Sequence, residues 1–148
     1  MNVVVYTLDE EPSPGRNFVH QLRLLLDRFE ISTGILSKLS VDAGWPARLS
    51  AATAYNLYRI VEEALNNVRL HSGVARVDVQ LGVIDDRMSL VVRDDGRGLL
   101  GPADSGRPGM GVMGMRERAV LLGGELEITS NEGEGTTVTA VVRGFTGG

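Results

Sequence analysis

The stretch "VARVDVQLGVIDDRMSLVVRD", residues 74–94, decides how the chain is expected to fold. It contains two runs, 74–84 and 87–94, in which apolar and polar residues alternate, and Asp85 and Asp86 lie between them. Alternation with a period of two is typical of strands with one buried face, and a two-residue connection joins antiparallel neighbours. The sequence therefore predicts a β-hairpin here.

A second hairpin is predicted near the end of the chain, where "ELEITSN" (125–131) and "GTTVTAVVR" (135–143) surround a glycine-rich turn. Helical spacing of apolar residues predicts helices over 16–30 and 112–122, and alternation predicts a strand over 34–41. Pro46 is expected to open a long helix that runs to about His71.

This order of elements predicts an α+β fold, a two-layer sandwich in which a mostly antiparallel mixed sheet packs on about three helices. A doubly wound parallel sheet fits poorly, because two hairpins leave too few crossover connections. We expect residues 1–15 to form an N-terminal strand or linker, with a short strand at 3–7, and residues 16–148 to form one catalytic domain.

Length and composition narrow the class of protein. The 148 residues include no cysteine and only two histidines, which excludes a disulfide framework and a histidine-built metal site. The net charge of -4 argues against nucleic-acid binding, which needs a basic face. No apolar run approaches membrane-spanning length, so we expect a cytoplasmic domain without direct membrane contact.

The segment "GMGVMG" (109–114) has the spacing of a dinucleotide-binding turn. That fingerprint requires a buried strand directly before its first glycine, whereas "LLGPADSGRP" precedes it here. Consecutive glycines followed at once by a helix form either an anion site at the helix N-terminus or a glycine-rich cap without a ligand. The segment alone leaves both interpretations open.

The long helix has two distinct faces when it is projected at 100° per residue. Its core face is predicted to contain Leu57, Ile60, Val61, Ala64, Leu65 and Val68. A separate edge carries Asn56, Arg59, Glu63 and Asn67, with Leu70 in the same stripe and His71 at its margin. This edge is either a solvated surface or a site where a carboxylate lies beside an amide oxygen that suits Mg²⁺.

Two turns add further candidates. Asp94 ends a predicted strand and is followed by Gly96 and Gly98, so the backbone can approach a flat ligand while the carboxylate accepts a hydrogen bond from an exocyclic amine. The segment "GEGTT" (133–137) places a hydroxyl group at the start of a strand.

Taken together, four segments resemble the motifs of the GHKL ATPases. "EALNNVRLHS" (63–72) resembles the N box, "DDGRG" (94–98) the G1 box, "GMGVMGMRERA" (109–119) the G2 box and "GEGTTV" (133–138) the terminal threonine motif. "LYRIVEEALNN" and "GMRERA" are similar to the catalytic and ATP-binding domain of bacterial sensor histidine kinases of the nitrate-sensor and degradation-sensor type. The resemblance covers about residues 16–143 and implies the Bergerat, or GHKL, fold.

The resemblance implies a role for each matching residue. Glu63 would orient or accept a proton during phosphoryl transfer, and Asn67 would bind Mg²⁺ through its amide oxygen. Asp94 would accept a hydrogen bond from the adenine amino group of ATP, and Thr136 would lie near the adenine. The remaining nucleotide contacts are expected from His71, Gly96, Gly98, Gly109, Gly111, Val112 and Gly114.

Two positions depart from the family pattern. Leu70 stands where the family usually has Lys or Arg, and Met110 stands where its G2 box commonly has His. Each change removes a potential phosphate contact, so we expect weak ATP binding unless Arg69, Arg97 or Arg116 compensates. Arg116 and Arg118 are either phosphate ligands or solvated side chains.

The sequence thus predicts a protein-histidine kinase domain that binds Mg-ATP and phosphorylates a histidine on a separate dimerisation and phosphoacceptor domain, with a response regulator downstream. His20 does not match the family's acceptor motif and is expected to be structural. Two alternatives remain, an anti-sigma-factor type of serine kinase and a non-catalytic nucleotide-sensing or docking module.

Overall fold

The computed structural model describes residues 17–70, 73–96, 110–131 and 133–143. The strand expected at residues 3–7, and the linker of which it is part, lie outside these ranges. Along the chain the elements are α1 (Phe18–Thr33), β1 (Leu36–Val41), α2 (Ala51–Leu70), β2 (Arg76–Ile84), β3 (Arg87–Asp94), α4 (Met110–Leu121), β4 (Glu125–Asn131) and β5 (Gly135–Val142).

Both predicted hairpins are present. β2 pairs antiparallel with β3 up to the pair Ile84 and Arg87, and β4 pairs antiparallel with β5. Asp85 and Asp86 form the connection with φ angles of 49° and 67°. Positive φ at both central residues is the geometry of the turn whose twist matches that of the flanking strands, and aspartate tolerates it better than most residues.

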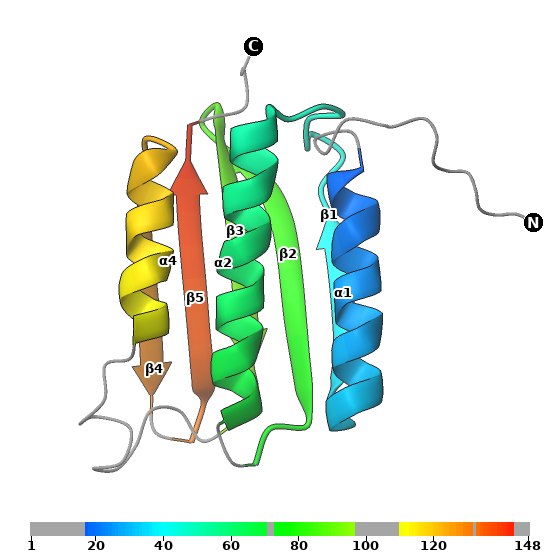
Figure 1. Ribbon diagram of the computed structural model, residues 1–148. Coiled ribbons are helices and arrows are strands. Elements are labelled where there is room, and N and C mark those ends of the chain that lie inside the picture. Colours follow the sequence, from blue (N-terminus) through cyan, green and yellow to red (C-terminus); the bar gives the residue numbers. More distant parts are fainter. Residues whose placement is uncertain (1–16, 71–72, 97–109, 132, 144–148) are drawn as a thin grey trace, which may run out of the picture.

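The two hairpins combine into one mixed sheet with the strand order β1-β2-β3-β5-β4. Only the pairing of β1 with β2 is parallel among the described strands. All three described helices lie on one face of this sheet, which gives the predicted two-layer α+β sandwich (Figure 1). No helix in the described part of the chain is long and apolar enough to cross a membrane.

The long helix packs on the sheet through the face that the sequence predicts. Leu57, Ile60, Val61, Ala64, Leu65 and Val68 are all at most 3% exposed. Burial of a side chain of this size stabilises the fold by about 1.5–3 kcal/mol relative to exposure, so this face fixes the rotation of α2 over the sheet. The polar edge of the helix is thereby directed to one side, toward α4.

The predicted start of this helix at Pro46 is wrong, because α2 begins at Ala51. The Ser50 hydroxyl accepts a hydrogen bond from the backbone N–H of Thr53 at 3.1 Å. A serine that caps the free N–H groups of the first turn sets the helix start more strongly than a proline that merely tolerates it.

The β4–β5 ribbon generates a prediction about stability. Gly124→Ala should lower the free energy of unfolding by about 3 kcal/mol, because a Cβ at this position would overlap the backbone carbonyl oxygen of Val141. Urea unfolding followed by circular dichroism measures the loss. Gly44→Ala is the control, since its Cβ would meet Asp42 at 3.4 Å, an ordinary contact distance. Equal stability of both variants would contradict the close approach of the strands.

Candidate functional site

The residues that the sequence singles out converge on one end of the sandwich. The C-terminal end of α2, the end of β3, the start of β5 and the start of α4 all lie at the same end of the domain (Figure 1). The antiparallel register of β3 and β5, in which Arg93 is opposite Thr137, accounts for the meeting of the two strand ends. His71, Gly98 and Gly109 lie outside the described residues.

Asp94 is the most deeply buried charged side chain of this region, with 4% exposure. Its Oδ1 atom accepts hydrogen bonds from the backbone N–H of Gly96 at 2.9 Å and from that of Thr136 at 3.2 Å. Burying a carboxylate is costly unless hydrogen bonds compensate, and these two bonds also fix its orientation. A carboxylate held in this way can accept a hydrogen bond from a ligand amine.

Gly135 makes this arrangement possible, although its role is not evident from the sequence alone. Its φ angle is +83°, and a Cβ at this position would overlap the backbone carbonyl oxygen of Asp94. Only glycine lets β5 start so close to the end of β3. The neighbouring Thr136 is 6% exposed, and its hydroxyl lies 3.2 Å from that of Ser130.

The polar edge of α2 supplies a second group of candidates. Glu63 and Asn67 are half-buried and four residues apart, so they occupy neighbouring positions on one helix face. A carboxylate next to an amide oxygen is a donor set that fits Mg²⁺, which takes one or two protein groups and completes its shell with water and phosphate oxygens. Leu70, the last residue of the helix, is 68% exposed.

The first turns of α4 supply the glycines. Gly111 and Gly114 lie within this helix, and the half-buried Val112 packs against the core. The free N–H groups of a helix N-terminus and the helix dipole favour an anion at this position. The first turn of α4 contains no acidic residue that would oppose such an anion.

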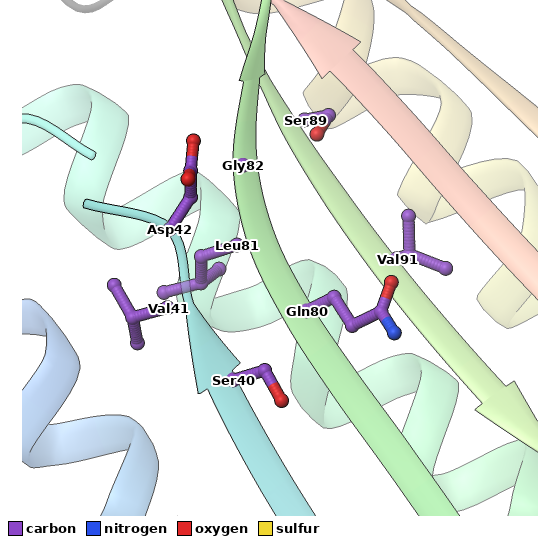
Figure 2. Close-up of a pocket in the computed structure, with 8 residues that line it drawn as sticks. All are labelled: Ser40, Val41, Asp42, Gln80, Leu81, Gly82, Ser89 and Val91. Atoms are coloured by element: carbon purple, nitrogen blue, oxygen red, sulfur yellow. The ribbon is translucent and has the colours of Figure 1, made fainter. Parts of the chain in front are cut away.

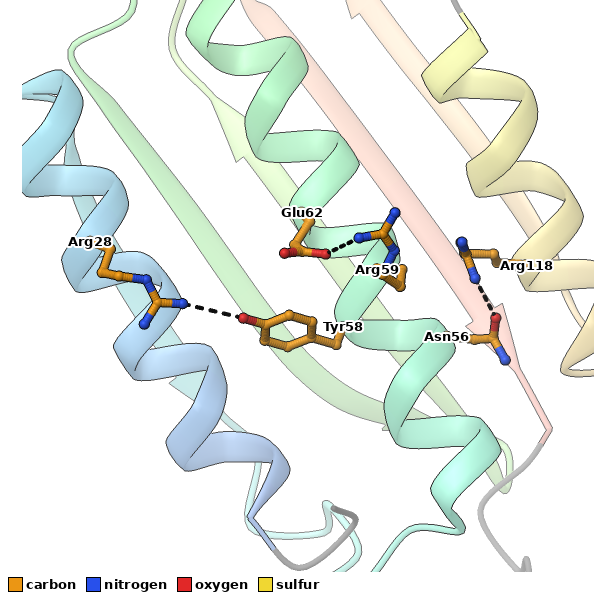
Figure 3. Close-up of polar contacts among 6 residues, drawn as sticks. All are labelled: Arg28, Asn56, Tyr58, Arg59, Glu62 and Arg118. Carbon is orange, nitrogen blue, oxygen red and sulfur yellow. Dashed lines mark hydrogen bonds and ion pairs between the residues drawn. The ribbon is translucent and has the colours of Figure 1, made fainter. Parts of the chain in front are cut away.

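The two arginines of α4, whose role the sequence left open, both make contacts within the protein. Arg116 donates a hydrogen bond to the backbone carbonyl of Leu126 on β4 at 3.0 Å. Arg118 donates one to Oδ1 of Asn56 on α2 at 2.9 Å (Figure 3). His20 is exposed on α1, so the structural role expected for it does not come from burial in the core.

Asp95 is a residue whose role the sequence analysis missed. Its Oδ1 accepts hydrogen bonds from the backbone N–H groups of Ala75 at 2.8 Å and Arg76 at 3.0 Å, which ties the turn after β3 to the start of β2. Partial burial acts to raise the pKa of the Asp95 carboxyl, but the bonds from Arg76 and Ala75 outweigh it, so the pKa lies below its usual value of 3.8. The two consecutive aspartates, Asp94 and Asp95, were the feature of the sequence that could have indicated a second carboxylate with a structural role.

Two shallow hollows are lined by other residues; the first lies away from this end of the domain, and the second reaches it at Asn66 and Arg69 of α2. One, of about 310 Å³, lies on the open face of the sheet near the end of β1, and its lining includes Ser40, Gln80 and Ser89 (Figure 2). The other, of about 340 Å³, lies between α1 and α2 and is lined by residues such as Phe29 and Leu65. Neither contains any of the predicted site residues.

Over the described residues, a five-stranded mixed sheet covered on one face by three helices defines the class of fold, a two-layer α+β sandwich that is also found in histidine kinase domains. A solved histidine kinase domain from Erythrobacter litoralis, the blue-light activated kinase EL346, superposes with a TM-score of 0.68 and 26% sequence identity. The match covers 85% of this chain and 64% of that one.

The family follows from the sequence comparison. Residues 52–144, more than half of the chain, match the family described as histidine kinase-, DNA gyrase B- and HSP90-like ATPase, and the chain belongs to this family. It is 33% identical over 136 residues to the sensor histidine kinase LnrJ of Bacillus subtilis. It is 39% identical over 119 residues to the histidine-protein kinase/phosphatase UhpB of Salmonella typhimurium.

These matches cover 92% and 80% of this chain but only 32% and 23% of the two relatives. The chain therefore spans about a quarter to a third of their length, the part that corresponds to the catalytic ATP-binding domain. The expected GHKL fold and the resemblance to the ATPase domain of sensor histidine kinases are confirmed. The roles of the individual site residues stay predictions.

The hydrogen bonds to Asp95 generate a prediction about pH. Because its pKa is lower in the folded state, the charged carboxylate stabilises the fold above the usual value of 3.8 that applies to the unfolded chain, and this contribution is lost as the pH falls through the folded pKa. Asp95→Asn, which keeps an acceptor oxygen but no charge, should be less stable than the parent protein at pH 6. The difference should shrink toward pH 2 in urea unfolding, and a difference independent of pH would contradict this assignment.

Proposed function

We propose that this domain binds Mg-ATP at the end of the sandwich where α2, β3, β5 and α4 meet, and that it transfers the γ-phosphoryl group to a histidine of a separate dimerisation and phosphoacceptor domain. A response regulator would then take the phosphoryl group from that histidine. The proposal extends the membership in the ATPase family and the likeness to sensor histidine kinases.

The observation that carries the proposal is the buried carboxylate of Asp94, which is fixed by two backbone N–H groups beside Gly96. The exocyclic amine of adenine is a hydrogen-bond donor, and a fixed carboxylate is a strong acceptor for it. Gly96 has no side chain to separate the backbone from the flat face of the base. Adenine would therefore be selected at the β3–β5 end of the site.

The phosphates would extend from the adenine toward the gap between α2 and α4. Gly111, Gly114 and the free N–H groups of α4 would hold their oxygens on one side of this gap. On the other side, the amide oxygen of Asn67 would hold Mg²⁺. When bound, Mg²⁺ supplies the positive charge that neutralises the β- and γ-phosphate oxygens.

Glu63 would act on the acceptor rather than on the nucleotide. In the transfer, the bond between the γ-phosphorus and the bridging oxygen breaks, a bond from phosphorus to an imidazole nitrogen forms, and ADP leaves. A carboxylate one helical turn from Asn67 is suited to orient the acceptor imidazole and to take up its proton. Positioning and charge neutralisation are the main contributions that a protein makes to phosphoryl transfer.

Leu70 generates a prediction about affinity. Since it is 68% exposed at the last position of α2, Leu70→Lys costs no burial and restores a cation near the expected phosphates. A charge-assisted contact contributes about 1.5–3 kcal/mol, so the variant should bind Mg-ATP at least about tenfold more tightly in isothermal titration. The parent protein should bind weakly, and a submicromolar dissociation constant would show that the missing contacts are dispensable.

The matched control is Ile31→Lys, which adds the same charge at an 84% exposed apolar position of α1. It should leave the affinity for Mg-ATP unchanged. An equal gain in both variants would indicate a nonspecific effect of net charge rather than a contact with phosphate.

Transfer of the phosphoryl group is tested with γ-³²P-labelled ATP and the phosphoacceptor domain of the same kinase. We expect acid-labile label on the acceptor histidine, and Asp94→Asn, which loses the negative charge expected to bind adenine, should abolish it while the fold remains intact by circular dichroism. Label on a partner's serine would instead identify a serine kinase. Bound but unhydrolysed nucleotide would identify a nucleotide-sensing module, which the exposed Leu70 favours.

A further inference from the structure

A polar contact joins α2 to α4 where the two helices pack against each other. A guanidinium nitrogen of Arg118 lies 2.9 Å from Oδ1 of Asn56 (Figure 3). Asn56 is 9% exposed, and its Nδ2 donates to the backbone carbonyl of Ala52 at 2.9 Å. Because the nitrogen of the amide is engaged in this way, its oxygen is directed to Arg118.

The guanidinium of Arg118 is held from a second direction as well. It lies over the ring of Tyr55, 5.4 Å from the ring centroid. A charged donor to a buried amide forms a stronger hydrogen bond than a neutral donor does, and the aromatic face adds a smaller attraction. Two consecutive residues of α2 therefore fix one side chain of α4.

On each of the two helices, the residue that makes this contact lies on the same face as the residues of the proposed site. On α2, Asn56 and Glu63 are seven residues apart and share a face. On α4, Arg118 is four residues from Gly114 and seven from Gly111. Seven residues of helix correspond to about 10 Å and the eleven from Asn56 to Asn67 to about 16 Å, so the contact lies about 10 to 16 Å from the proposed site along the two helices.

We propose that Asn56 and Arg118 are positioning residues that set the distance between two parts of the site, the magnesium-binding edge of α2 and the phosphate-binding start of α4. This inference rests on the proposed function. Helices that are packed without such a contact can slide or tilt by fractions of an ångström. One directed hydrogen bond between them restricts this movement and so fixes the distance between their facing residues. Productive phosphate geometry is sensitive to displacements on this scale.

The two parts of the nucleotide are expected to depend differently on this contact. Adenine would bind at the β3–β5 end through Asp94, which belongs to the sheet, whereas the phosphates and Mg²⁺ would bind between the two helices. Loss of the Asn56–Arg118 contact should therefore weaken binding of Mg-ATP and leave binding of adenosine unchanged. A contact that served only the stability of the fold would not discriminate between the two ligands.

The experiment compares Asn56→Ala, Arg118→Met, the double variant and the parent protein. Mg-ATP binding is measured by isothermal titration, and adenosine binding by the shift of the Thr136 amide resonance. Each single variant should raise the dissociation constant for Mg-ATP about tenfold, the loss expected for a charge-assisted bond, and the double variant should be no worse than either. Arg118→Gln, which loses the charge but keeps a polar side chain, replaces Arg118→Met if that variant does not fold, and Arg118→Lys, which keeps the charge and a donor, should retain most of the affinity.

Arg28→Met is the matched control, since Arg28 reaches the Tyr58 hydroxyl from the opposite side of α2 at 3.4 Å. It should change neither affinity. The inference is overturned if the variants weaken Mg-ATP and adenosine by the same factor, or if Arg28→Met has the same effect as Arg118→Met. If the parent protein binds neither ligand, the proposed function itself fails.

Discussion

The packing of α2 on the sheet is the constraint on which the rest of the domain depends. Six apolar side chains on one face of this helix are almost completely buried, and their burial leaves the helix one rotation about its axis. Glu63 and Asn67 therefore lie on the edge of α2 from which Asn56 contacts α4, and the described residues show no hydrogen bond or ion pair that holds these two side chains. The side of α2 on which the functional edge lies is thus a consequence of core formation, whereas the spacing of this edge from α4 depends on side-chain contacts between the two helices.

The two halves of the proposed site are built by different means. The β3–β5 half is made of backbone: Asp94 is oriented by two amide N–H groups, and Gly135 allows the strands to approach closely. The other half lies between two helices and depends on side-chain contacts such as that of Arg118 with Asn56. Backbone hydrogen bonds within a sheet change little between states, whereas helices can move relative to each other. A shift of α4 relative to α2 can therefore change how the phosphates are bound without changing how the base is recognised.

Regular patterns made the fold predictable. Alternation over 74–94 and helical periodicity in α2 specified the elements and the core face, because each reflects burial of one side of one element. The start of α2 was wrong, since the cap by Ser50 is a local hydrogen bond that competes with the signal from Pro46. The contact partners of Gly135, Asp95 and Arg118 could not be predicted, because they lie 19 to 62 residues away in the sequence.

The single parallel pairing in the sheet has a consequence for the order of assembly. β1 must pair with β2 across a connection that includes all of α2, so that Leu36 lies opposite Arg76, whereas β2 with β3 and β4 with β5 close over short turns. Closing a longer connection costs more chain entropy, and such pairings form late. The two hairpins therefore form first, whereas the pairings of β1 with β2 and of β3 with β5 bridge 40 and 44 to 54 residues of chain and form late. The junction of β3 with β5 at the nucleotide end is thus itself a late step, in which two hairpins that have already formed are brought together.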